Sequence, residues 1–217
     1  MPPPRITVLI SGRGSNLGAL LAAMDAGTLH GVVDTVIANR ADAPGLAIAS
    51  AHGIATRVVE HRAYTERDAF DAALASAVDA GAPDLIVLAG FMRVLGAAFV
   101  RRYAGRMINI HPSLLPLYHG LHTHRRALAD GVRIHGCTVH FVTPDVDVGP
   151  IIAQAAVPVL NGDDETTLAA RVLAAEHVLL PAVVRWYCTG RLVIDGSRVH
   201  VKDEDRSHTA VLIAPAV

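Results

Sequence analysis

The sequence predicts an α/β fold, an open and mostly parallel twisted sheet with helices on both faces. Three observations lead to this prediction. Short apolar runs alternate with segments of helical periodicity through residues 6–110, as in parallel strands joined by helical crossovers. The first apolar run ends in a glycine-rich turn that opens a helix. Two later β-rich runs are joined by a short proline-flanked turn, which indicates an antiparallel pair in the C-terminal half of this Rossmann-like sheet.

The first half of the chain supplies the parallel strands. Apolar runs typical of strands lie at residues 6–10, 32–38, 55–59, 84–89 and 106–110. Helical patterns lie between them, at residues 17–24, 44–52, 70–78 and 91–103. In the first helix, Leu17, Leu20, Leu21 and Met24 repeat at helical spacing. The run at 84–89 is apolar after its first residue, as in strands buried on both faces.

The second half adds the antiparallel pair and a long helix. Residues 136–143 and 150–159 are β-rich, and a Pro-Asp-x-Asp-x-Gly-Pro turn joins them. Acidic residues at 163–165 precede a helix whose apolar face carries Leu168, Val172, Leu179 and Val183. Two short β-like pieces follow Gly190. We expect a single domain over residues 1–217, with a loosely ordered tail from 203 to 217.

Composition excludes several classes of chemistry. Lys202 is the single lysine among 19 basic residues, so the chain has no P-loop lysine and a Schiff-base mechanism would depend on that residue. Cys137 and Cys188 are too few for a four-cysteine zinc site and indicate a reducing, cytoplasmic compartment. A signal peptide and an uncharged apolar run of about 18 residues are both absent. With a net charge of −1, we expect small-molecule substrates and neither a nucleic-acid nor a membrane partner.

The glycine-rich turn Gly12-Arg13-Gly14 is a candidate anion site. It does not fit a dinucleotide fingerprint, because Leu17 replaces the third glycine and the second strand ends in Ala-Asn-Arg without an acidic residue. Backbone N–H groups of Gly14, Ser15 and Asn16 at a helix N-terminus would instead bind a phosphate. A plain strand-to-helix turn capped by Ser15 or Asn16 explains the same residues equally well.

A second candidate site follows the strand at 106–110. Alternation along the strand places Asn109 and His111 on the same side, at the strand end where ligands bind in open α/β sheets. An amide there suits oxyanion stabilisation, and an imidazole suits proton transfer. Asp145 and Asp147, both in the proline-flanked turn, are alternative carboxylate partners for His111. A hydrogen-bonded core histidine is the competing interpretation, and we favour the functional one.

Histidine is concentrated around this site, because six of the 12 histidines lie between His111 and His140. The five others are candidates for a metal site: His119, His122, His124, His135 and His140. Their spacing argues against one, since there is no H-E-x-x-H and His122 and His124 would face apart on a helix. We therefore expect no metal.

These motifs resemble those of phosphoribosylglycinamide (GAR) formyltransferases, the folate-dependent GAR transformylases of purine biosynthesis. The resemblance extends from about Ile6 to Leu192 and is carried by VLISGRGSNL (8–17), DLIVLAGFMRVL (84–95), NIHPSLLP (109–116), GLHTHRRAL (120–128), GCTVHFVTPDVDVGPI (136–151) and AAEH (174–177). It implies a formyltransferase fold and transfer of the formyl group of 10-formyltetrahydrofolate to the amine of GAR. The products would be formyl-GAR and tetrahydrofolate, on the route to IMP.

The resemblance also implies roles for individual residues. Asn109 would bind folate and stabilise the tetrahedral intermediate, His111 would donate a proton, and Asp147 would raise the pKa of His111. The residues implied to bind GAR through its phosphate and ribose are Gly14, Ser15, Asn16 and Glu176. Those implied to contact folate, besides Asn109, are Arg67, Met92, Arg93, Val94 and Leu95.

Three residues depart from the family pattern without removing a catalytic group. Arg13 stands where asparagine or another polar residue is common, and it would add a charge near the phosphate. His119 replaces a usual proline. Val148 replaces a common glycine after Asp147 and would affect the mobility of the folate loop.

Rival functions share part of this residue set. Formyltetrahydrofolate deformylases use water with the same Asn-His-Asp set, but carry an N-terminal regulatory domain for which a first strand at Ile6 leaves no room. Methionyl-tRNA formyltransferases usually add a C-terminal domain and a basic surface. A non-catalytic sugar-phosphate-binding module would need the Gly14 turn but not Asn109, His111 and Asp147. Among these we expect the GAR formyltransferase activity, in a monomer or homodimer.

Overall fold

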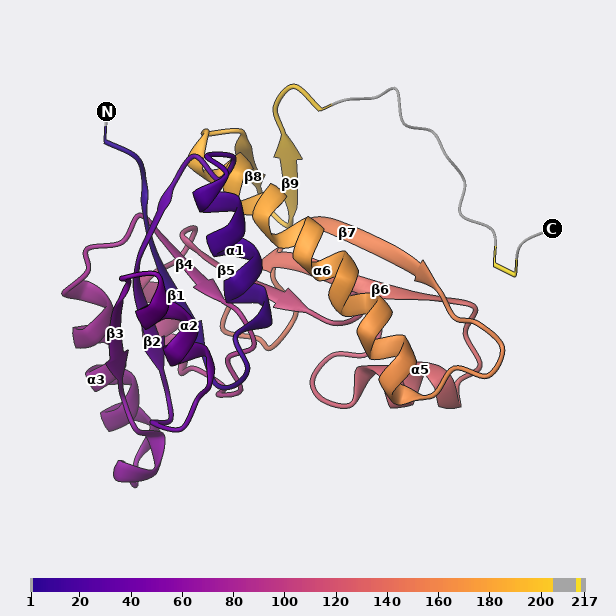
Figure 1. Cartoon of the computed structure of the whole chain (residues 1–217), viewed down its shortest axis with the longest axis horizontal. Coiled ribbons are helices and arrows are strands. Elements are labelled where there is room, and N and C mark those ends of the chain that lie inside the picture. Colours follow the sequence, from indigo (N-terminus) through magenta and orange to yellow (C-terminus); the bar gives the residue numbers. More distant parts are fainter. Residues whose placement is uncertain (1, 205–213, 216–217) are drawn as a thin grey trace.

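One mixed sheet organises the chain. The structure, a computed structural model, describes residues 2–204 and 214–215, so most of the tail expected at 203–217 lies outside the described residues. Over the described residues, nine strands form one sheet in the order β3-β2-β1-β4-β5-β6-β7-β9-β8 (Figure 1). The strands are β1 Arg5–Ile10, β2 Val32–Ala38, β3 Ala55–Val58, β4 Leu85–Leu88, β5 Met107–His111, β6 Ile134–Phe141, β7 Ile151–Pro158, β8 Leu192–Asp195 and β9 Arg198–Val201.

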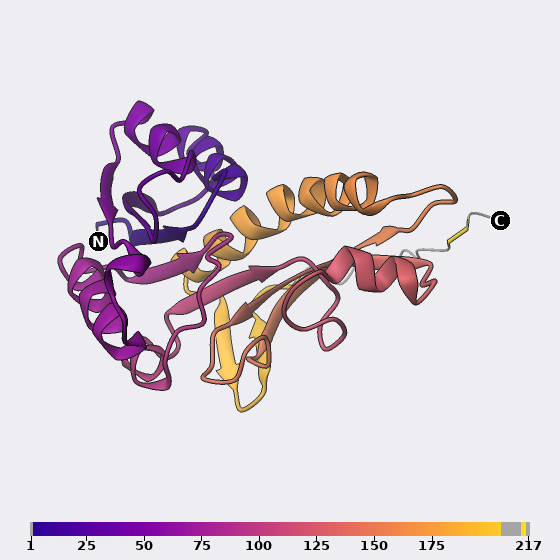
Figure 2. The same cartoon turned by 90° about the horizontal axis from the view of Figure 1, so that it is seen from below.

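Helices cover both faces of this sheet, as predicted. The helices are α1 Ser15–Asp25, α2 Gly45–Ala51, α3 Arg67–Asp79, α4 Ala97–Arg102, α5 Thr123–Ala129 and α6 Glu165–Cys188, with a 3-10 turn at His61–Ala63. The apolar residues of α1, α2 and α6 pack into one buried cluster, and those of α3 and α4 pack into a second one. Figure 2 shows α1 and α6 on one side of the sheet and α3 on the other.

The parallel part of the sheet contains a switch point. Strands β3, β2, β1, β4 and β5 are parallel, and Val8 of β1 lies between Val36 of β2 and Val87 of β4. The chain builds outward from β1 to β3 on one side and then from β4 to β5 on the other. A crevice therefore opens beyond the carboxyl ends of β1 and β4, where ligands bind in sheets of this kind.

The antiparallel part also agrees with the prediction. Strand β6 pairs antiparallel with both β5 and β7, and its register sets His140 opposite Asn109 and Thr138 opposite His111. The two β-like pieces after Gly190 form the hairpin β8–β9, which joins β7 through the pair Ile151 and Arg198.

The helix expected over 91–103 is the main error of the prediction. Only Ala97–Arg102 is helical, and residues 91–96 run as an irregular segment. Phe91 and Leu95 are buried, whereas Met92 and Val94 are exposed. The apolar residues therefore belong to a loop with two side chains in the core and two at the surface. Helix α5 and the 3-10 turn were not expected from the sequence.

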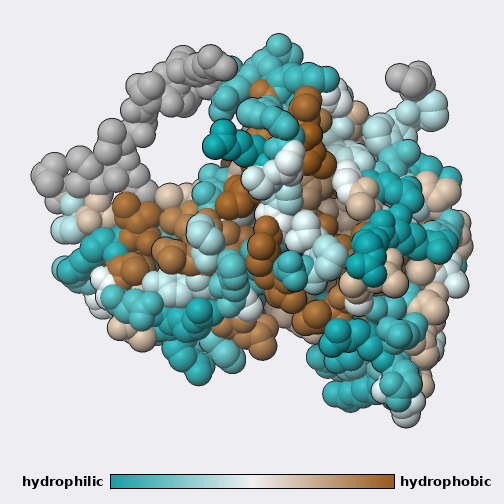
Figure 3. Space-filling view, turned by 180° about the vertical axis from the view of Figure 1, so that it is seen from behind, coloured by the Kyte–Doolittle hydropathy of each residue, from teal (hydrophilic) through white to brown (hydrophobic). Residues whose placement is uncertain are grey.

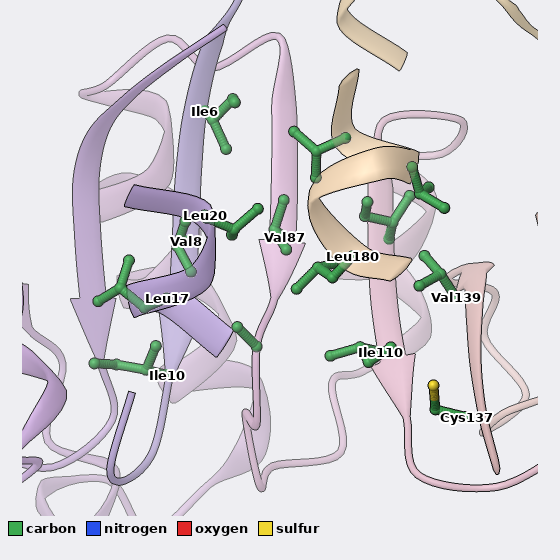
Figure 4. Packing of buried hydrophobic residues seen from close by; sticks show 14 of the residues in the cluster. Ile6, Val8, Ile10, Leu17, Leu20, Val87, Ile110, Cys137, Val139 and Leu180 are labelled. Carbon is green, nitrogen blue, oxygen red and sulfur yellow. The ribbon is translucent and has the colours of Figure 1, made fainter. Parts of the chain in front are cut away.

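The long helix α6 is a core helix of this fold. Asp164 caps it, and a capping box links Asp164 with Thr167. By length and composition alone, α6 is the one helix in the described part of the chain that qualifies as a candidate membrane span. One face, however, packs on α1, α5, β6 and β7. Figure 4 shows Leu180 of α6 among side chains of α1 and the central strands.

Candidate active site

Three chain segments meet at the switch point of the sheet. They are the glycine turn after β1, the irregular segment after β4, and the end of β5. Backbone and side-chain bonds join the first two, because Ser11 N–H donates to Gly90 O at 3.1 Å and Met92 N–H donates to Ser11 Oγ at 2.7 Å. The segment after β4 is thereby held beside the glycine turn.

The first cavity at this junction is predominantly apolar and has a volume of about 440 Å³. Its walls include the segment after β4, the end of β5 and the turn at 144–147. Of the residues implied to contact folate, the walls contain Asn109, Met92, Arg93, Val94 and Leu95. Arg67 is not among its lining residues and lies at the start of α3, near Gly96.

Exposed apolar side chains are a feature of this cavity. Met92, Val94, Leu121 and Val146 line it, and each is about half exposed or more. Figure 3 shows the face opposite α1 and α6, where apolar surface gathers over the middle of the molecule between hydrophilic edges. Water-accessible apolar walls of this kind suit a flat, largely apolar ligand.

Asn109 is held by a neighbour on β6. Its Nδ2 lies 3.2 Å from His140 Nε2, and His140 Nδ1 lies 2.9 Å from the carbonyl oxygen of Phe141. Because a carbonyl only accepts, His140 carries its proton on Nδ1, and its Nε2 accepts from the Asn109 amide. This bond fixes the Asn109 amide at the cavity wall. His140 was not assigned to the site from the sequence, although its antiparallel register opposite Asn109 carries that information.

His111 lies between two hydrogen-bond acceptors. Its Nε2 is 2.9 Å from the carbonyl oxygen of Tyr118, and its Nδ1 is 3.4 Å from Asp147 Oδ2. Burial lowers the pKa of His111 below its usual value and outweighs Tyr118 and Asp147, which both raise it. The expectation that Asp147 raises this pKa therefore describes one contribution correctly, whereas the net shift is downward because the ring is only 6% exposed.

The structure brings Asp147, and not Asp145, to His111. Asp147 has a left-handed backbone (φ 58°), and its Oδ2 accepts from Gly120 N–H at 2.8 Å. Asp145 is exposed on the cavity rim. Burial would raise the pKa of Asp147, but the nearby His140 ring, the Gly120 N–H and the His111 ring outweigh it and hold the pKa below its ordinary value. Asp147 is therefore an anion at neutral pH.

The second cavity is larger and more polar, with a volume of about 930 Å³, and it surrounds the N-terminus of α1. Gly14, Ser15 and Asn16 line it together with Glu176. Gly14 is the N-cap with φ 76°, and no side chain caps the helix, so the plain Ser or Asn cap considered from the sequence is not formed. The uncapped N–H groups and the helix dipole make this end a suitable site for a phosphate.

Glu176 and Asn16 form a buried polar pair at the inner end of the second cavity. Asn16 Nδ2 donates to Glu176 Oε2 at 2.7 Å, which ties α6 to the start of α1. Burial raises the pKa of Glu176 above its ordinary value, and the bond from Asn16 partly opposes this rise. A carboxylate in this position can accept hydrogen bonds from ligand hydroxyl groups.

The two cavities share walls. Residues that line both are Gly90, Met92, Arg93, Ile110, Pro112, His124 and Glu165. The apolar cavity with Asn109, His111 and Asp147 therefore adjoins the polar cavity at the glycine turn. Two ligands bound side by side would meet at this shared wall.

The remaining histidines and the three departures from the family pattern lie around the site. His124 and His135 pack edge to face with ring centroids 5.4 Å apart, and burial lowers both pKa values, that of His135 to about 4. Within residues 2–204 and 214–215, no group of three or more His, Cys, Asp or Glu side chains is arranged to hold a metal ion. Arg13 is exposed on the wall of the polar cavity, and His119 and Val148 are exposed near Asp147.

The fold and the site define an α/β enzyme with an amide, an imidazole and a carboxylate facing one of two adjoining cavities. Comparison with known proteins agrees. The family described as Formyl transferase matches residues 4–184. Phosphoribosylglycinamide formyltransferase of Escherichia coli K12 is 52% identical over 187 residues, which cover 86% of this chain and 88% of that protein.

Solved structures give the same result. Glycinamide ribonucleotide transformylase 1 of Symbiobacterium toebii superposes with a TM-score of 0.90 at 49% identity, covering 92% of this chain and 94% of that one. Formyltetrahydrofolate deformylase of Burkholderia mallei has a TM-score of 0.83 at 29% identity and covers 92% of this chain but 70% of that one. The chain belongs to the formyl transferase family and is a formyl-group transferase. The resemblance inferred from the sequence motifs is confirmed.

Proposed function

We propose that the chain transfers the formyl group of 10-formyltetrahydrofolate to the amine of 5'-phosphoribosylglycinamide, in purine biosynthesis. The observation that carries this proposal is the pair of adjoining cavities. The polar one offers a phosphate site and Glu176, and the apolar one offers walls for a folate beside Asn109 and His111. A transfer between two substrates needs both cavities, whereas hydrolysis needs only the apolar one.

In the proposed reaction the glycinamide amine attacks the formyl carbon, and the formyl oxygen takes up the electron pair of the carbonyl bond. The amide N–H of Asn109 and the Nε2–H of protonated His111, which would exchange Tyr118 O for the substrate oxygen, would stabilise that oxyanion. The bond from the formyl carbon to N10 then breaks, and the amine proton moves to N10. Each group of this kind typically contributes about 10²–10³-fold in rate.

His111 is suited to donate because both of its nitrogens face acceptors. Tyr118 O and the Asp147 carboxylate can only accept, so the neutral ring satisfies one of them and the protonated ring satisfies both. Asp147 would hold the ring and stabilise its positive charge when the proton is needed.

Substitution of His111 or Asp147 by alanine tests the assignment. We expect each variant to fold but to lose about 10²-fold or more in formyl transfer, because a proton donor or its partner is removed. His200→Ala, an exposed histidine on β9, is the control and should keep wild-type turnover. Near wild-type turnover of the His111 or Asp147 variant would overturn the proposed roles.

Formate release in the absence of glycinamide ribonucleotide separates the rival functions. A transferase consumes 10-formyltetrahydrofolate only when the amine substrate is present. Release of formate without it would identify a deformylase, and binding without turnover would identify a sugar-phosphate-binding module.

For the remaining expectations we propose small-molecule substrates only, a cytoplasmic location and a single domain over residues 1–217. The similarity to bacterial enzymes of purine biosynthesis supports the location. The continuous sheet of the described residues supports the single domain.

A further inference from the structure

The segment between β4 and α4 lines both cavities without regular secondary structure. Residues 91–96 form this segment, which we call the wall segment. Its beginning is held by the bond from Met92 N–H to Ser11 Oγ on the β1 side. Its far end is held by the buried Leu95 side chain, and a polar attachment there would also fix the backbone that carries Arg93 and Val94.

The second attachment comes from a buried carboxylate on α3. Asp71 Oδ2 accepts from Gly96 N–H at 2.7 Å, and the residue is only 7% exposed. Its Oδ1 is also buried and has no hydrogen-bond partner among the described residues. Burial raises the pKa of Asp71, while the Gly96 N–H and the charge of Arg67 oppose that rise. Keeping this carboxylate buried costs free energy, so its bond to Gly96 is not an incidental surface contact.

The glycine at position 96 is explained by this contact. Its backbone is extended, with φ −70° and ψ 154°, so any residue could adopt it. A Cβ at this position, however, would lie 2.6 Å from Asp71 Oδ2. A larger residue here would force the carboxylate or the wall segment to shift, so glycine permits the close approach and the two residues form one fitted contact.

Helix α3 holds the middle of the wall segment as well. The Arg93 guanidinium carbon lies 6.0 Å from the centroid of the Phe70 ring, the residue that precedes Asp71. One helical turn earlier, Arg67 starts α3 beside Gly96. The face of α3 that carries Arg67, Phe70 and Asp71 thus supports the wall segment from outside the cavity.

We propose that Asp71 is a positioning residue for the folate co-substrate, because its carboxylate holds Gly96 and so fixes the wall segment on which the co-substrate binds. The inference rests on the proposed function. Asp71 is not among the residues that line either cavity and acts through the backbone. Its loss should therefore weaken binding of the folate and leave the chemistry of Asn109, His111 and Asp147 intact.

Steady-state kinetics with both substrates test this role. For Asp71→Ala we expect the KM for 10-formyltetrahydrofolate to rise about tenfold, with kcat and the KM for glycinamide ribonucleotide within about threefold of wild type. Asp71→Asn keeps an acceptor oxygen and should stay within about threefold in all three constants. Asp68→Asn is the matched control, because its carboxylate is near Gly96 but exposed and makes no bond to it among the described residues.

The same contact can be disturbed from the other side. Gly96→Ala should reproduce the folate KM of Asp71→Ala, because the new methyl group displaces the segment. The double variant should be no worse than either single variant, since Asp71→Ala removes the oxygen with which the methyl group collides. Additive effects, an unchanged folate KM in Asp71→Ala, or equal damage in Asp71→Asn would overturn the proposal.

Hydrogen exchange at the Gly96 amide separates this inference from the proposed function. Protection should be strong in wild type and Asp71→Asn and lost in Asp71→Ala. An enzyme without formyl transfer would refute the proposed function, and the exchange data would still decide whether Asp71 holds the wall segment. If Asp71→Ala does not fold, the folate KM of Gly96→Ala and of Asp71→Asn decides whether the contact between Asp71 and Gly96 holds the wall segment.

Discussion

The ring of His111 is held between a carbonyl oxygen and a carboxylate, although its burial disfavours a positive charge. These opposing effects leave the imidazole poised, because small changes in its surroundings alter its protonation. Displacement of Tyr118 O by a substrate atom would be one such change. Burial favours the neutral form of His111, and Asp147 favours the protonated form.

Asp147→Asn tests this balance. The change removes a negative charge but keeps the shape and an acceptor for Gly120 N–H, so the pKa of His111 should fall further below its ordinary value. An NMR titration of the His111 ring measures the shift directly. Asp145→Asn, which removes an exposed carboxylate two residues earlier, should leave the pKa unchanged. A His111 pKa that stays the same in Asp147→Asn would contradict the assigned role.

Strand alternation alone was sufficient to place Asn109 and His111 on one side of β5. It did not choose between Asp145 and Asp147, since that choice depends on the left-handed backbone of Asp147 and its bond to Gly120. His140 belongs to a motif shared with the family and is expected to shape the site or pack around it, but spacing alone assigns it no contact with Asn109. Its place opposite Asn109 depends on the register of two strands that are 31 residues apart at this pair.

Among the elements, the turn between β6 and β7 is packed closely against the end of β6. Gly149 closes it against the preceding strand, and a Cβ there would lie 1.8 Å from the carbonyl oxygen of Phe141. Phe141 N–H in turn donates to Pro150 O at 3.0 Å. The turn that carries Asp147 is thus clamped by a contact that only glycine permits.

Gly149→Ala should therefore damage both stability and turnover. We expect a loss of about 1–3 kcal/mol in the free energy of unfolding, as for other overpacked sites, together with a lower kcat because Asp147 moves away from His111. Urea unfolding and steady-state kinetics measure the two effects. Gly18→Ala in α1 meets open space and should stabilise the protein by about 0.5–1 kcal/mol. A Gly149→Ala protein as stable and active as wild type would refute this account.

Element prediction succeeded where one physical cause dominated. The strands β1, β2 and β4 are apolar because both sides of the sheet are covered, and α6 begins at acidic residues that cap it. The prediction of a helix over residues 91–96 is wrong because the apolar residues there line a cavity or fill the core beneath it. Hydrophobic spacing does not distinguish these causes from a helix, and the bond from Gly96 N–H to Asp71 joins residues that are 25 apart in the sequence.

For the whole molecule, buried histidines link stability to pH. The pKa values of His111, His124 and His135 are all lowered in the folded state, that of His135 to about 4. The unfolded chain therefore binds more protons between about pH 6.5 and 4. The contribution of these histidines to the free energy of unfolding is fully present above that range and is lost as the pH falls through it. His135 alone accounts for roughly 3 kcal/mol.

His135→Leu should flatten this dependence. The variant cannot take up a proton at this site, so its free energy of unfolding should fall less between pH 7 and pH 4.5 than that of wild type. Urea unfolding at several pH values gives the slopes. His200→Leu removes an exposed histidine and should keep the wild-type slope. An equal slope in His135→Leu and wild type would show that His135 is not buried as a neutral ring.

Because the two cavities share a wall, the binding of one substrate is thermodynamically linked to the binding of the other. A ligand in either cavity rests on Gly90, Met92, Arg93 and Pro112, so it changes the surface that the other ligand meets. If one substrate changes the affinity of the other by some factor, the second changes the affinity of the first by the same factor. The reason is that the free energy of the ternary complex does not depend on the order of binding. The same reciprocity extends to the products, so formylated ribonucleotide and tetrahydrofolate change each other's affinity by the same factor.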